Sequence, residues 1–444
     1  MGLGRFGGGL DAAAFAHQAG SNVRVTDMAP AEKLKDSLSR LRAVGNIELS
    51  LGAHKNSDFE WADVVVANPA VPPDNEYLQV ASLNGALVTS QMNIFFELCP
   101  AIIIGITGAN GKSTTTALTA HLLEKSAQDK QAGRVWLGGN IGNRPLLTTL
   151  DQIAAEDLAV LEISSFQLEP LAEIRQAPHV ALLTNLTPNH LDRHGTFENY
   201  CAAKENIFKF QRPHTGSPPV SIFNSEDEIA AQWYARYSKD PNRICISYHR
   251  ADVPKRISSV FKLPGPANLS NLAGAMAVAR HFNISDSRIR DVLPDFKALP
   301  HRLELVRELN GVRWYNDSIA TTPPSTIAAL EAFNEPIILI AGGYDKKLPF
   351  DELGRRIADR AKAVVLIGQT SSKIAQAIAT GRANNAESIS VETVDSLAGA
   401  VKTANLFAKS GDVVLLSPAC ASYDMFENFQ QRGIQFAELV RDIK

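Results

Sequence analysis

The chain carries the stretch IIIGITGANGKST at residues 102–114, and a helical pattern follows it from Thr115 to Lys125. An apolar strand, a glycine turn, a Lys-Ser pair and a helix together predict a loop that binds a nucleoside triphosphate. In such a loop, backbone N–H groups and the lysine hold phosphate oxygens, and the serine hydroxyl binds Mg²⁺. Ile106 stands where the strict motif has glycine, so the match is to a variant. A glycine-rich turn with a chance Lys-Ser pair is the alternative interpretation.

Short apolar runs alternate with helical patterns along nearly the whole chain, which predicts stacked βα units and mostly parallel sheets. We expect strands at residues 64–67, 102–107, 158–163, 180–185, 337–341, 363–367 and 413–417. Breaks near residues 97–100 and 297–301 predict three α/β domains, at 1–98, 99–297 and 298–444. Ligands of such sheets collect at the carboxyl ends of strands, so functional residues are expected there.

The composition excludes several classes of protein. Among 444 residues, 44 Lys and Arg stand against 47 Asp and Glu, giving a net charge of -3. This near balance removes the electrostatic case for a nucleic-acid or anionic-membrane binder. The four cysteines are widely spaced and show no zinc or disulfide pattern. The apolar stretches are shorter than the roughly 20 residues of a membrane helix. A reduced, cytoplasmic protein is therefore expected.

A second glycine turn, GLGRFG, opens the chain at residues 2–7, and Asp27 follows about 20 residues later. A helix at 10–19 and a strand at 23–26 fit this pattern, which on its own would suggest a dinucleotide site. Such a turn normally follows a buried strand, yet only Met1 precedes it. We expect that the true chain begins upstream. A sheet that lacks its central strand is the alternative.

Polar side chains that suit a phosphate-transfer site follow other predicted strands. Glu162 ends a buried run, where a carboxylate that binds Mg²⁺ is expected. His190, Asp192 and His194 follow the strand at 180–185 and form a candidate metal or substrate cluster. Lys204 lies in a helical stretch, and the residues alone predict an ordinary solvated lysine.

Six segments, taken in order, resemble the Mur ligases of peptidoglycan synthesis. They are TGANGKST (107–114), LEISSFQLE (161–169), NLTPNHLDRHGTFENYCAAKENIF (185–208), HRLE (301–304), NDSIAT (316–321) and SPACASYDMFENFQQRG (417–433). The resemblance implies a Rossmann-like N-terminal domain, a central P-loop ATPase domain and a Rossmann-like C-terminal domain. It also implies a monomeric enzyme that uses ATP to join D-glutamate to UDP-N-acetylmuramoyl-L-alanine through an acyl phosphate.

The resemblance implies roles for individual residues. The catalytic residues would be Lys112, Glu162, His190 and Lys204. Two Mg²⁺ ions would be held by Ser113, Glu162, His190 and Lys204, the lysine as a carbamate. ATP would contact Gly108, Asn110, Gly111, Lys112, Ser113, Thr114, Asn268, Asn271, Arg302 and Asp317. The UDP substrate would contact Gly4, Arg5, Phe6, Asp27, Asn140 and His190. Glutamate would contact Thr321, Lys346, Ser422, Tyr423 and Phe429.

One departure from the family pattern concerns the amino-acid acceptor. Ile319 stands where many Mur ligases of this kind have lysine, so the chain lacks an ammonium group beside an acidic substrate. Lys346 or Lys347 would then supply the positive charge. L-glutamate or another amino acid is an alternative acceptor, and a folate-type ligase is an alternative enzyme. A nucleotide-binding protein that has lost its chemistry is the alternative from another class.

Overall fold

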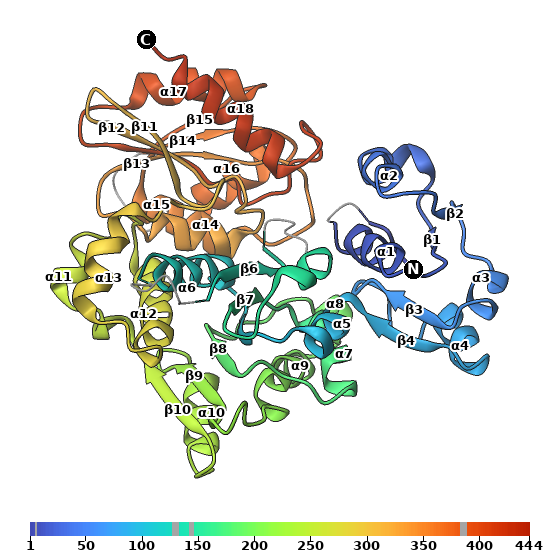
Figure 1. Ribbon diagram of the computed structural model, residues 1–444. Coiled ribbons are helices and arrows are strands. Elements are labelled where there is room, and N and C mark those ends of the chain that lie inside the picture. Colours follow the sequence, from blue (N-terminus) through green and yellow to red (C-terminus); the bar gives the residue numbers. More distant parts are fainter. Residues whose placement is uncertain (5–6, 127–132, 142–145, 382–388) are drawn as a thin grey trace. The chain divides into compact units, whose positions relative to one another are not determined.

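The computed structural model describes residues 1–4, 7–126, 133–141, 146–381 and 389–444. It contains two compact units, one of residues 1–259 with 270–293 and the other of 260–269 with 294–444 (Figure 1). The first unit holds the N-terminal and central α/β regions, and the second holds the C-terminal region. The helix α12 (Pro266–His281) has residues in both units. The domain boundaries at residues 98 and 298 stay a prediction.

The N-terminal region has two small parallel sheets, β1 (Arg24–Asp27) with β2 (Glu48–Leu51), and β3 (Val64–Ala67) with β4 (Leu87–Ser90). Its helices are α1 (Gly8–Gln18), η1 (Ala31–Lys33), α2 (Lys35–Arg42), α3 (Asn56–Glu60), α4 (Glu76–Leu83) and α5 (Gln91–Leu98). The first residues hydrogen-bond with both sheets. The N–H of Gly2 donates to the carbonyl oxygen of Thr26 at 2.8 Å, and the N–H of Asn68 donates to that of Met1 at 3.0 Å.

A six-stranded parallel sheet forms the central region, in the order β10-β9-β8-β5-β7-β6. Its strands are β5 (Ile102–Thr107), β6 (Val135–Gly139), β7 (Leu158–Glu162), β8 (Val180–Leu183), β9 (Val220–Asn224) and β10 (Ile244–Tyr248). Its helices are α6 (Lys112–Ser126), η2 (Leu147–Gln152), α7 (Ser165–Glu173), α8 (Leu191–His194), α9 (Phe197–Lys209), α10 (Glu228–Tyr237), η3 (Arg250–Asp252), α11 (Lys255–Ser258) and α13 (Asp286–Val292). The innermost strands are β5 and β8, which carry the predicted phosphate loop and the turn after residue 183.

The second unit has a six-stranded sheet in the order β11-β12-β16-β13-β14-β15. Its strands are β11 (Glu304–Leu309), β12 (Val312–Asn316), β13 (Ile337–Ala341), β14 (Ala361–Leu366), β15 (Ser390–Thr393) and β16 (Val413–Leu416). Its helices are η4 (Leu293–Asp295, at its border), α14 (Pro323–Leu330), α15 (Asp351–Arg360), α16 (Ser371–Gly381), α17 (Leu397–Phe407) and α18 (Phe429–Arg441). The pair β11–β12 is antiparallel and the other pairs of this sheet are parallel.

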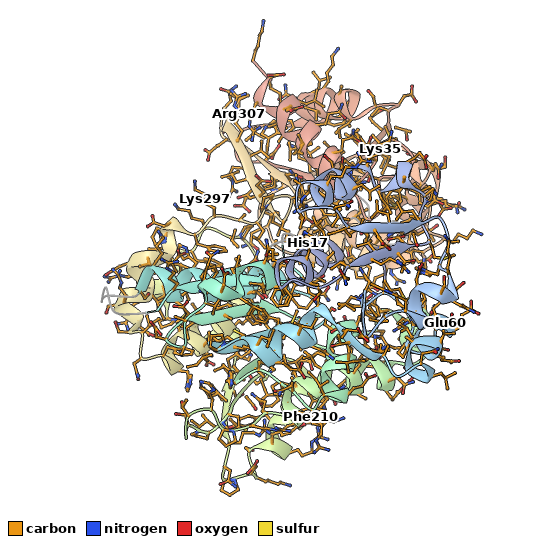
Figure 2. The ribbon with its side chains drawn as sticks, turned by 45° about the vertical axis from the view of Figure 1, so that its right-hand side comes forward. His17, Lys35, Glu60, Phe210, Lys297 and Arg307 are labelled. Carbon is orange, nitrogen blue, oxygen red and sulfur yellow. The ribbon has the colours of Figure 1, made fainter. Side chains whose placement is uncertain are left out.

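Successive residues of the inner strands of this sheet face opposite cores, because side chains alternate along a strand. Ile337 and Leu339 of β13 belong to one buried cluster, and Ile338 and Ile340 belong to the other. Both faces are therefore covered, as continuous apolar strands require. The chain end is fixed to the same unit, since the guanidinium of Arg307 on β11 (Figure 2) donates to the carbonyl oxygens of residues 440, 441 and 443.

The predicted fold class is confirmed. The seven predicted strands correspond to β3, β5, β7, β8, β13, β14 and β16, with ends that differ by two residues or fewer. The predicted helix and strand after the first glycine turn correspond to α1 and β1. The sequence did not indicate β2, β4, β6, β9, β10, β12 or β15. The residues of β2, β6, β10 and β15 are in large part exposed or half-buried, whereas β9 and β12 are buried but contain polar residues.

Truncating a buried strand residue should destabilise the second unit. Leu339 is fully buried in β13, so Leu339→Ala should lower the free energy of unfolding by about 2–5 kcal/mol through lost burial and a cavity. Leu406→Ala is the control, because Leu406 is 76% exposed and should change it by less than about 0.5 kcal/mol. Urea unfolding of both variants measures this. Equal losses in the two variants would contradict the two-faced core.

Candidate active site

The predicted phosphate loop connects β5 to α6 and is braced by the end of β8. The N–H of Ala109 donates to the carbonyl oxygen of Asn185 at 2.8 Å, and that of Asn110 donates to the Asn185 side chain at 2.9 Å. The Asn185 amide and the Thr184 hydroxyl donate back to the carbonyl oxygen of Asn110. These bonds fix the course of the loop without using the side chains of Lys112 and Ser113.

Two glycines make this close approach possible. Gly108 has a φ of 148°, and a Cβ there would lie 1.9 Å from the Thr184 hydroxyl oxygen. Gly111 has a φ of 79°, and a Cβ there would lie 2.2 Å from the side-chain oxygen of Asn271. Asn271 also accepts a hydrogen bond from the Thr115 hydroxyl at 3.2 Å. Asn271, predicted to contact ATP, therefore lies directly behind the loop.

Glu162 ends β7 with a buried carboxylate. The residue is 2% exposed, and its Oε2 atom has no hydrogen-bond partner among the described residues. The other oxygen accepts a long bond of 3.4 Å from the amide of Asn140. A buried carboxylate oxygen without a partner is costly unless a cation or water binds it. Glu162 and Asn140, predicted for metal and substrate, are therefore neighbours.

Lys204 is not the solvated lysine that its residue type alone predicted. It is 2% exposed on α9, and its ammonium group donates to the Thr107 hydroxyl at 3.3 Å and lies 4.8 Å from the Tyr200 ring centroid. Burial, followed by the charge of Lys112, lowers the pKa of Lys204 well below its usual value, while the charge of Glu162 opposes this. Lys204, Lys112 and Glu162 thus share one electrostatic environment.

The three polar residues after β8 have different surroundings: His190 and Asp192 are exposed, whereas His194 is buried. His190 is exposed, makes an edge contact with the Phe166 ring, and has a pKa lowered first by partial burial and then by Lys112 and Lys204. Asp192 is exposed as well. His194 is buried, with one ring nitrogen 3.0 Å from the Ser165 hydroxyl and the other 3.3 Å from Glu169.

The prediction of one metal cluster from all three residues is therefore wrong. Both ring nitrogens of His194 have partners within the protein, and in the part of the chain that the structure describes no group of three or more His, Cys, Asp or Glu could hold a metal ion. Among the three, His190 is the residue whose pKa is lowered, after the effect of partial burial, by the charge of Lys112 in the phosphate loop. Its role as a ligand of a second Mg²⁺ stays a prediction.

The first glycine turn is organised by Asp27. One carboxylate oxygen of Asp27 accepts from the N–H of Gly4 at 3.0 Å and the other from that of Ala29 at 2.8 Å. The carbonyl oxygen of Gly4 accepts from the Ser37 hydroxyl. Asp27, predicted to contact the UDP substrate, therefore also holds the backbone of the glycine turn through Gly4. Arg5 and Phe6, also predicted for the UDP substrate, lie outside the described residues.

In the second unit, the predicted ATP contacts Arg302 and Asp317 are close in space. Asp317 accepts hydrogen bonds from the Ser417 hydroxyl at 2.9 Å and from the N–H of Leu303 at 3.2 Å. Burial raises the pKa of Asp317 to about 7, while these bonds and the charge of Arg302 lower it in part. Asn268, another predicted ATP contact, donates to the carbonyl oxygen of Pro264 within the same unit.

Four of the five residues predicted for glutamate, all except Lys346, come from two segments that Arg432 joins. The guanidinium of Arg432 is 1% exposed and donates to Ser318 and to the carbonyl oxygen of Cys420. Thr321 follows the first of these segments, and Ser422 and Tyr423 follow the second. The Ser318 hydroxyl donates to the carbonyl oxygen of Phe429 at 2.8 Å. Sequence reasoning missed Arg432, because Gln431 and Gly433 flank it and nothing local indicates its burial.

The side chain of Ser422 is buried, Tyr423 is 66% exposed, and Lys346 and Lys347 are exposed. Ile319 is half-buried, and its N–H donates to the carbonyl oxygen of His301 at 3.3 Å. Lys346 and Lys347 are therefore open to an acidic ligand, whereas the side chain at position 319 is apolar. Which of the two lysines contacts glutamate stays a prediction.

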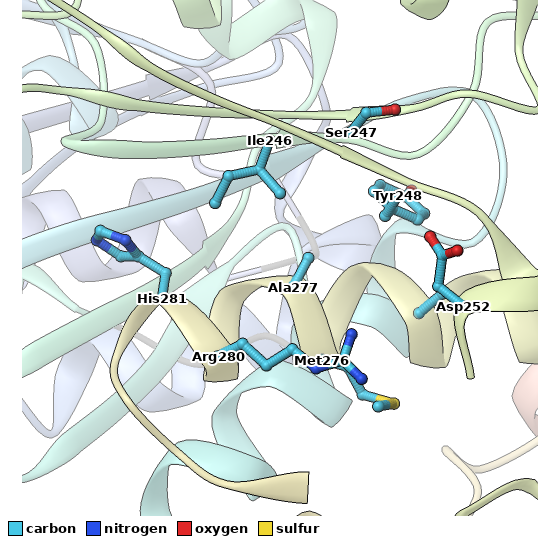
Figure 3. Close-up of a pocket in the computed structure, with 9 residues that line it drawn as sticks. Ile246, Ser247, Tyr248, Asp252, Met276, Ala277, Arg280 and His281 are labelled. Carbon is cyan, nitrogen blue, oxygen red and sulfur yellow. The ribbon is translucent and has the colours of Figure 1, made fainter. Parts of the chain in front are cut away.

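A separate cavity of about 250 Å³ lies between β10 and α12 (Figure 3). It is lined by Ile246, Ser247, Tyr248, Asp252, Ala273, Met276, Ala277, Arg280 and His281. None of these residues was predicted to bind a substrate. Among the described helices, none is long and apolar enough to cross a membrane.

Comparison with known proteins agrees with this arrangement of fold and site. Residues 106–258 match the Mur ligase middle domain, and residues 301–420 match the Mur ligase glutamate ligase domain. The structure is similar to that of the UDP-N-acetylmuramate–alanine ligase MurC from Thermotoga maritima, with a TM-score of 0.62 and 18% identity over 100% of this chain and 98% of that one. The class of protein is thus a Mur ligase, as the sequence predicted.

Full-length relatives define the branch of this class. A UDP-N-acetylmuramoylalanine–D-glutamate ligase from Roseiflexus sp. (strain RS-1) is 40% identical over 99% of this chain and 97% of its own length. One from Acetivibrio thermocellus is 38% identical over 97% of this chain and 93% of its own. The chain belongs to the UDP-N-acetylmuramoylalanine–D-glutamate ligase family.

The raised pKa of Asp317 predicts a pH-dependent stability. An unfolded carboxyl releases its proton near pH 4, but this one does so near pH 7, so the contribution of Asp317 to folding falls as the pH rises between these values. Asp317→Asn does not titrate. Its free energy of unfolding, relative to that of the wild type, should therefore increase by roughly 1–3 kcal/mol from about pH 5 to about pH 8. Thermal and urea unfolding at both pH values measure this, and a difference independent of pH would contradict the assignment.

Proposed function

We propose that the chain uses ATP to join the amino group of D-glutamate to the alanine carboxyl of UDP-N-acetylmuramoyl-L-alanine, in the cytoplasm. The observation that carries the proposal is the sequence identity of 40%, over nearly the whole length, to a UDP-N-acetylmuramoylalanine–D-glutamate ligase. It is supported by the phosphate loop and the buried Glu162 at neighbouring strand ends. The net charge of -3 for the whole chain is compatible with small anionic substrates that are bound locally.

The reaction has two steps. An oxygen of the alanine carboxylate attacks the terminal phosphorus of ATP, so a new O–P bond forms and ADP leaves. The glutamate amine then attacks the carbonyl carbon, so a C–N bond forms, the C–O bond to phosphate breaks, and the amine proton is released. The first step is needed because a free carboxylate is a poor electrophile. The products are ADP, phosphate and the amide.

The protein holds the phosphates of ATP in this scheme. The N–H groups of the loop at residues 108–114 surround the phosphate oxygens, and Lys112 adds a positive charge at the reacting phosphate. The side chain of Lys112 folds back over the loop, and its ammonium group donates to the carbonyl oxygen of Ala109 at 2.8 Å. Asn140 orients the muramoyl substrate beside Glu162. These contacts bring two anions together that would otherwise repel.

Mg²⁺ fits this site, because the Oε2 atom of Glu162 is buried and lacks a protein partner. Ser113 and Glu162 would hold a first ion, and His190 and a modified Lys204 would hold a second. When bound, Mg²⁺ neutralises the charges of the phosphate and the carboxylate as they approach. We expect the enzyme to act as a monomer.

Lys204 is proposed to be a carbamate in the active enzyme. Its Nζ atom is buried beside a hydroxyl group and an aromatic ring, where an unpaired ammonium is costly. Addition of CO₂ to the neutral amine forms an N–C bond and releases a proton. The side chain then becomes an anion with two oxygen atoms, which suits a hard cation.

Phosphate release tests the function directly. Purified protein with ATP, Mg²⁺, UDP-N-acetylmuramoyl-L-alanine and D-glutamate should release phosphate and form ADP. Glu162→Gln should lower kcat about 100-fold or more, because it removes a metal-binding charge. Glu173→Gln is the control, since Glu173 is exposed on α7, and it should keep wild-type kcat. Absence of release with both D- and L-glutamate would contradict the proposal.

Because Ile319 stands where many Mur ligases of this kind have lysine, the choice of amino-acid acceptor should be tested in the same assay. D-glutamate should give a higher kcat/KM than L-glutamate or other amino acids. Ile319→Lys should lower the KM for glutamate if the added ammonium contacts its carboxylate, and it should leave the KM for ATP unchanged. Preference for another amino acid would make the chain a ligase of different acceptor specificity.

The carbamate can be detected without an activity assay. After incubation with isotopically labelled bicarbonate, carbon NMR should show a carbamate signal in the wild type that Lys204→Arg lacks. Lys209→Arg is the control on the same helix, because Lys209 is exposed toward Glu205. A wild-type spectrum without that signal, under conditions in which the enzyme is active, would contradict the modification.

A further inference from the structure

Asp11, on the helix after the first glycine turn, is a buried carboxylate with many hydrogen bonds. It is 3% exposed. One oxygen accepts from the N–H groups of Leu146 and Leu147 at 3.1 and 3.0 Å and from the amide of Gln91 at 2.5 Å. The other accepts from the N–H and the hydroxyl of Thr148 at 3.2 and 2.7 Å. A residue of the N-terminal region thus binds the start of η2 in the central region.

The helix that carries Asp11 packs against both regions. Leu10 and Ala13 belong to the core of the N-terminal region, whereas Ala12 belongs to the core that contains Phe95 and the central strands. A Cβ on Gly9 would lie 2.6 Å from the carbonyl oxygens of residues 2 and 3. Because α1 touches the backbone of the glycine turn so closely, a shift of α1 would also shift the turn.

The residues that Asp11 binds are coupled to Asn140. The side chain of Leu146 packs on β6, where a Cβ on Gly138 would lie 2.3 Å from it. Asn140 follows β6 directly, its N–H donates to the carbonyl oxygen of Glu162 at 2.8 Å, and its amide contacts the Glu162 carboxylate. Asp11 is therefore connected through packed atoms to both predicted ends of the UDP-substrate site, the glycine turn and Asn140.

We propose that Asp11 is a positioning residue for the UDP substrate. It holds the glycine turn, which would bind the nucleotide, at a fixed separation from Asn140, which would bind the sugar-peptide end. A ligand that spans two regions binds best when their separation is already correct, since binding then need not order them. This inference rests on the proposed function, and it adds a residue that contacts neither ATP nor glutamate.

Asp11→Asn tests the inference because it keeps the size of the side chain but turns one acceptor into a donor that faces N–H groups. The KM for UDP-N-acetylmuramoyl-L-alanine should rise about tenfold or more. The KM values for ATP and D-glutamate should change less than about twofold, because their predicted contacts lie elsewhere. Thr148→Val removes only the hydroxyl donor and should raise the same KM about threefold.

Asp157→Asn is the matched control. Asp157 is also 3% exposed and accepts from the N–H groups of Arg134 and Ala154 and from the Trp136 indole, all within the central region. Asp157→Asn should lower the thermal midpoint as Asp11→Asn does, yet leave the KM for the UDP substrate unchanged. Equal effects of the two variants on that KM would overturn the inference, as would a wild-type KM in Asp11→Asn or, if that variant does not fold, in Thr148→Val.

Direct binding separates this inference from the proposed function. Calorimetry should show that the wild type binds UDP-N-acetylmuramoyl-L-alanine and that Asp11→Asn binds it about tenfold more weakly. A wild type that does not bind this compound would contradict the proposed function and, with it, the inference. Tight binding by the wild type with equal affinity in Asp11→Asn and Thr148→Val would overturn only the role of Asp11.

Discussion

The site in the first unit depends on hydrogen bonds between the phosphate loop and the end of the neighbouring strand. Thr184 and Asn185, directly after β8, bind the backbone of Ala109 and Asn110. This contact requires glycine at position 108 and places the loop beside the ends of β7 and β8. Glu162 and the turn that carries His190 are thereby brought to the loop. A parallel sheet with β5 at its centre is what makes all three strand ends adjacent.

Around the loop, charged side chains are buried with few partners. Glu162 has a carboxylate oxygen without a protein partner, and Lys204 is buried against a hydroxyl and a ring. Such groups reduce the stability of the empty site, because desolvated charge is costly. In the proposed function, Glu162 and a carbamylated Lys204 gain favourable partners once Mg²⁺ binds. We therefore expect binding of ATP with Mg²⁺ to stabilise the first unit.

Much of the fold follows from the sequence, because buried parallel strands are continuous apolar runs such as residues 337–341. Some of the strands that were missed, such as β15, are more exposed and have no such run. Others, such as β9, are buried, but polar residues such as Ser221 and Asn224 interrupt the apolar run. The burial of Lys204 could have been foreseen, since Tyr200 and Phe208 lie four residues away on the same helix face. The inward turn of His194 and the hydrogen bonds of Asp11 depend on contacts between distant segments. The apolar residues around Asp11 on α1 were a usable signal that this acid is buried, but no local pattern indicates its partners or those of His194.

The central claim is that ATP activates the alanine carboxylate as an acyl phosphate. It is tested most directly by placing a heavy-oxygen label in that carboxylate and analysing the released phosphate by mass spectrometry. In the proposed reaction the carboxylate oxygen that attacks phosphorus leaves with the phosphate. The account therefore predicts labelled phosphate in step with amide formation. Amide formed with unlabelled phosphate would contradict it.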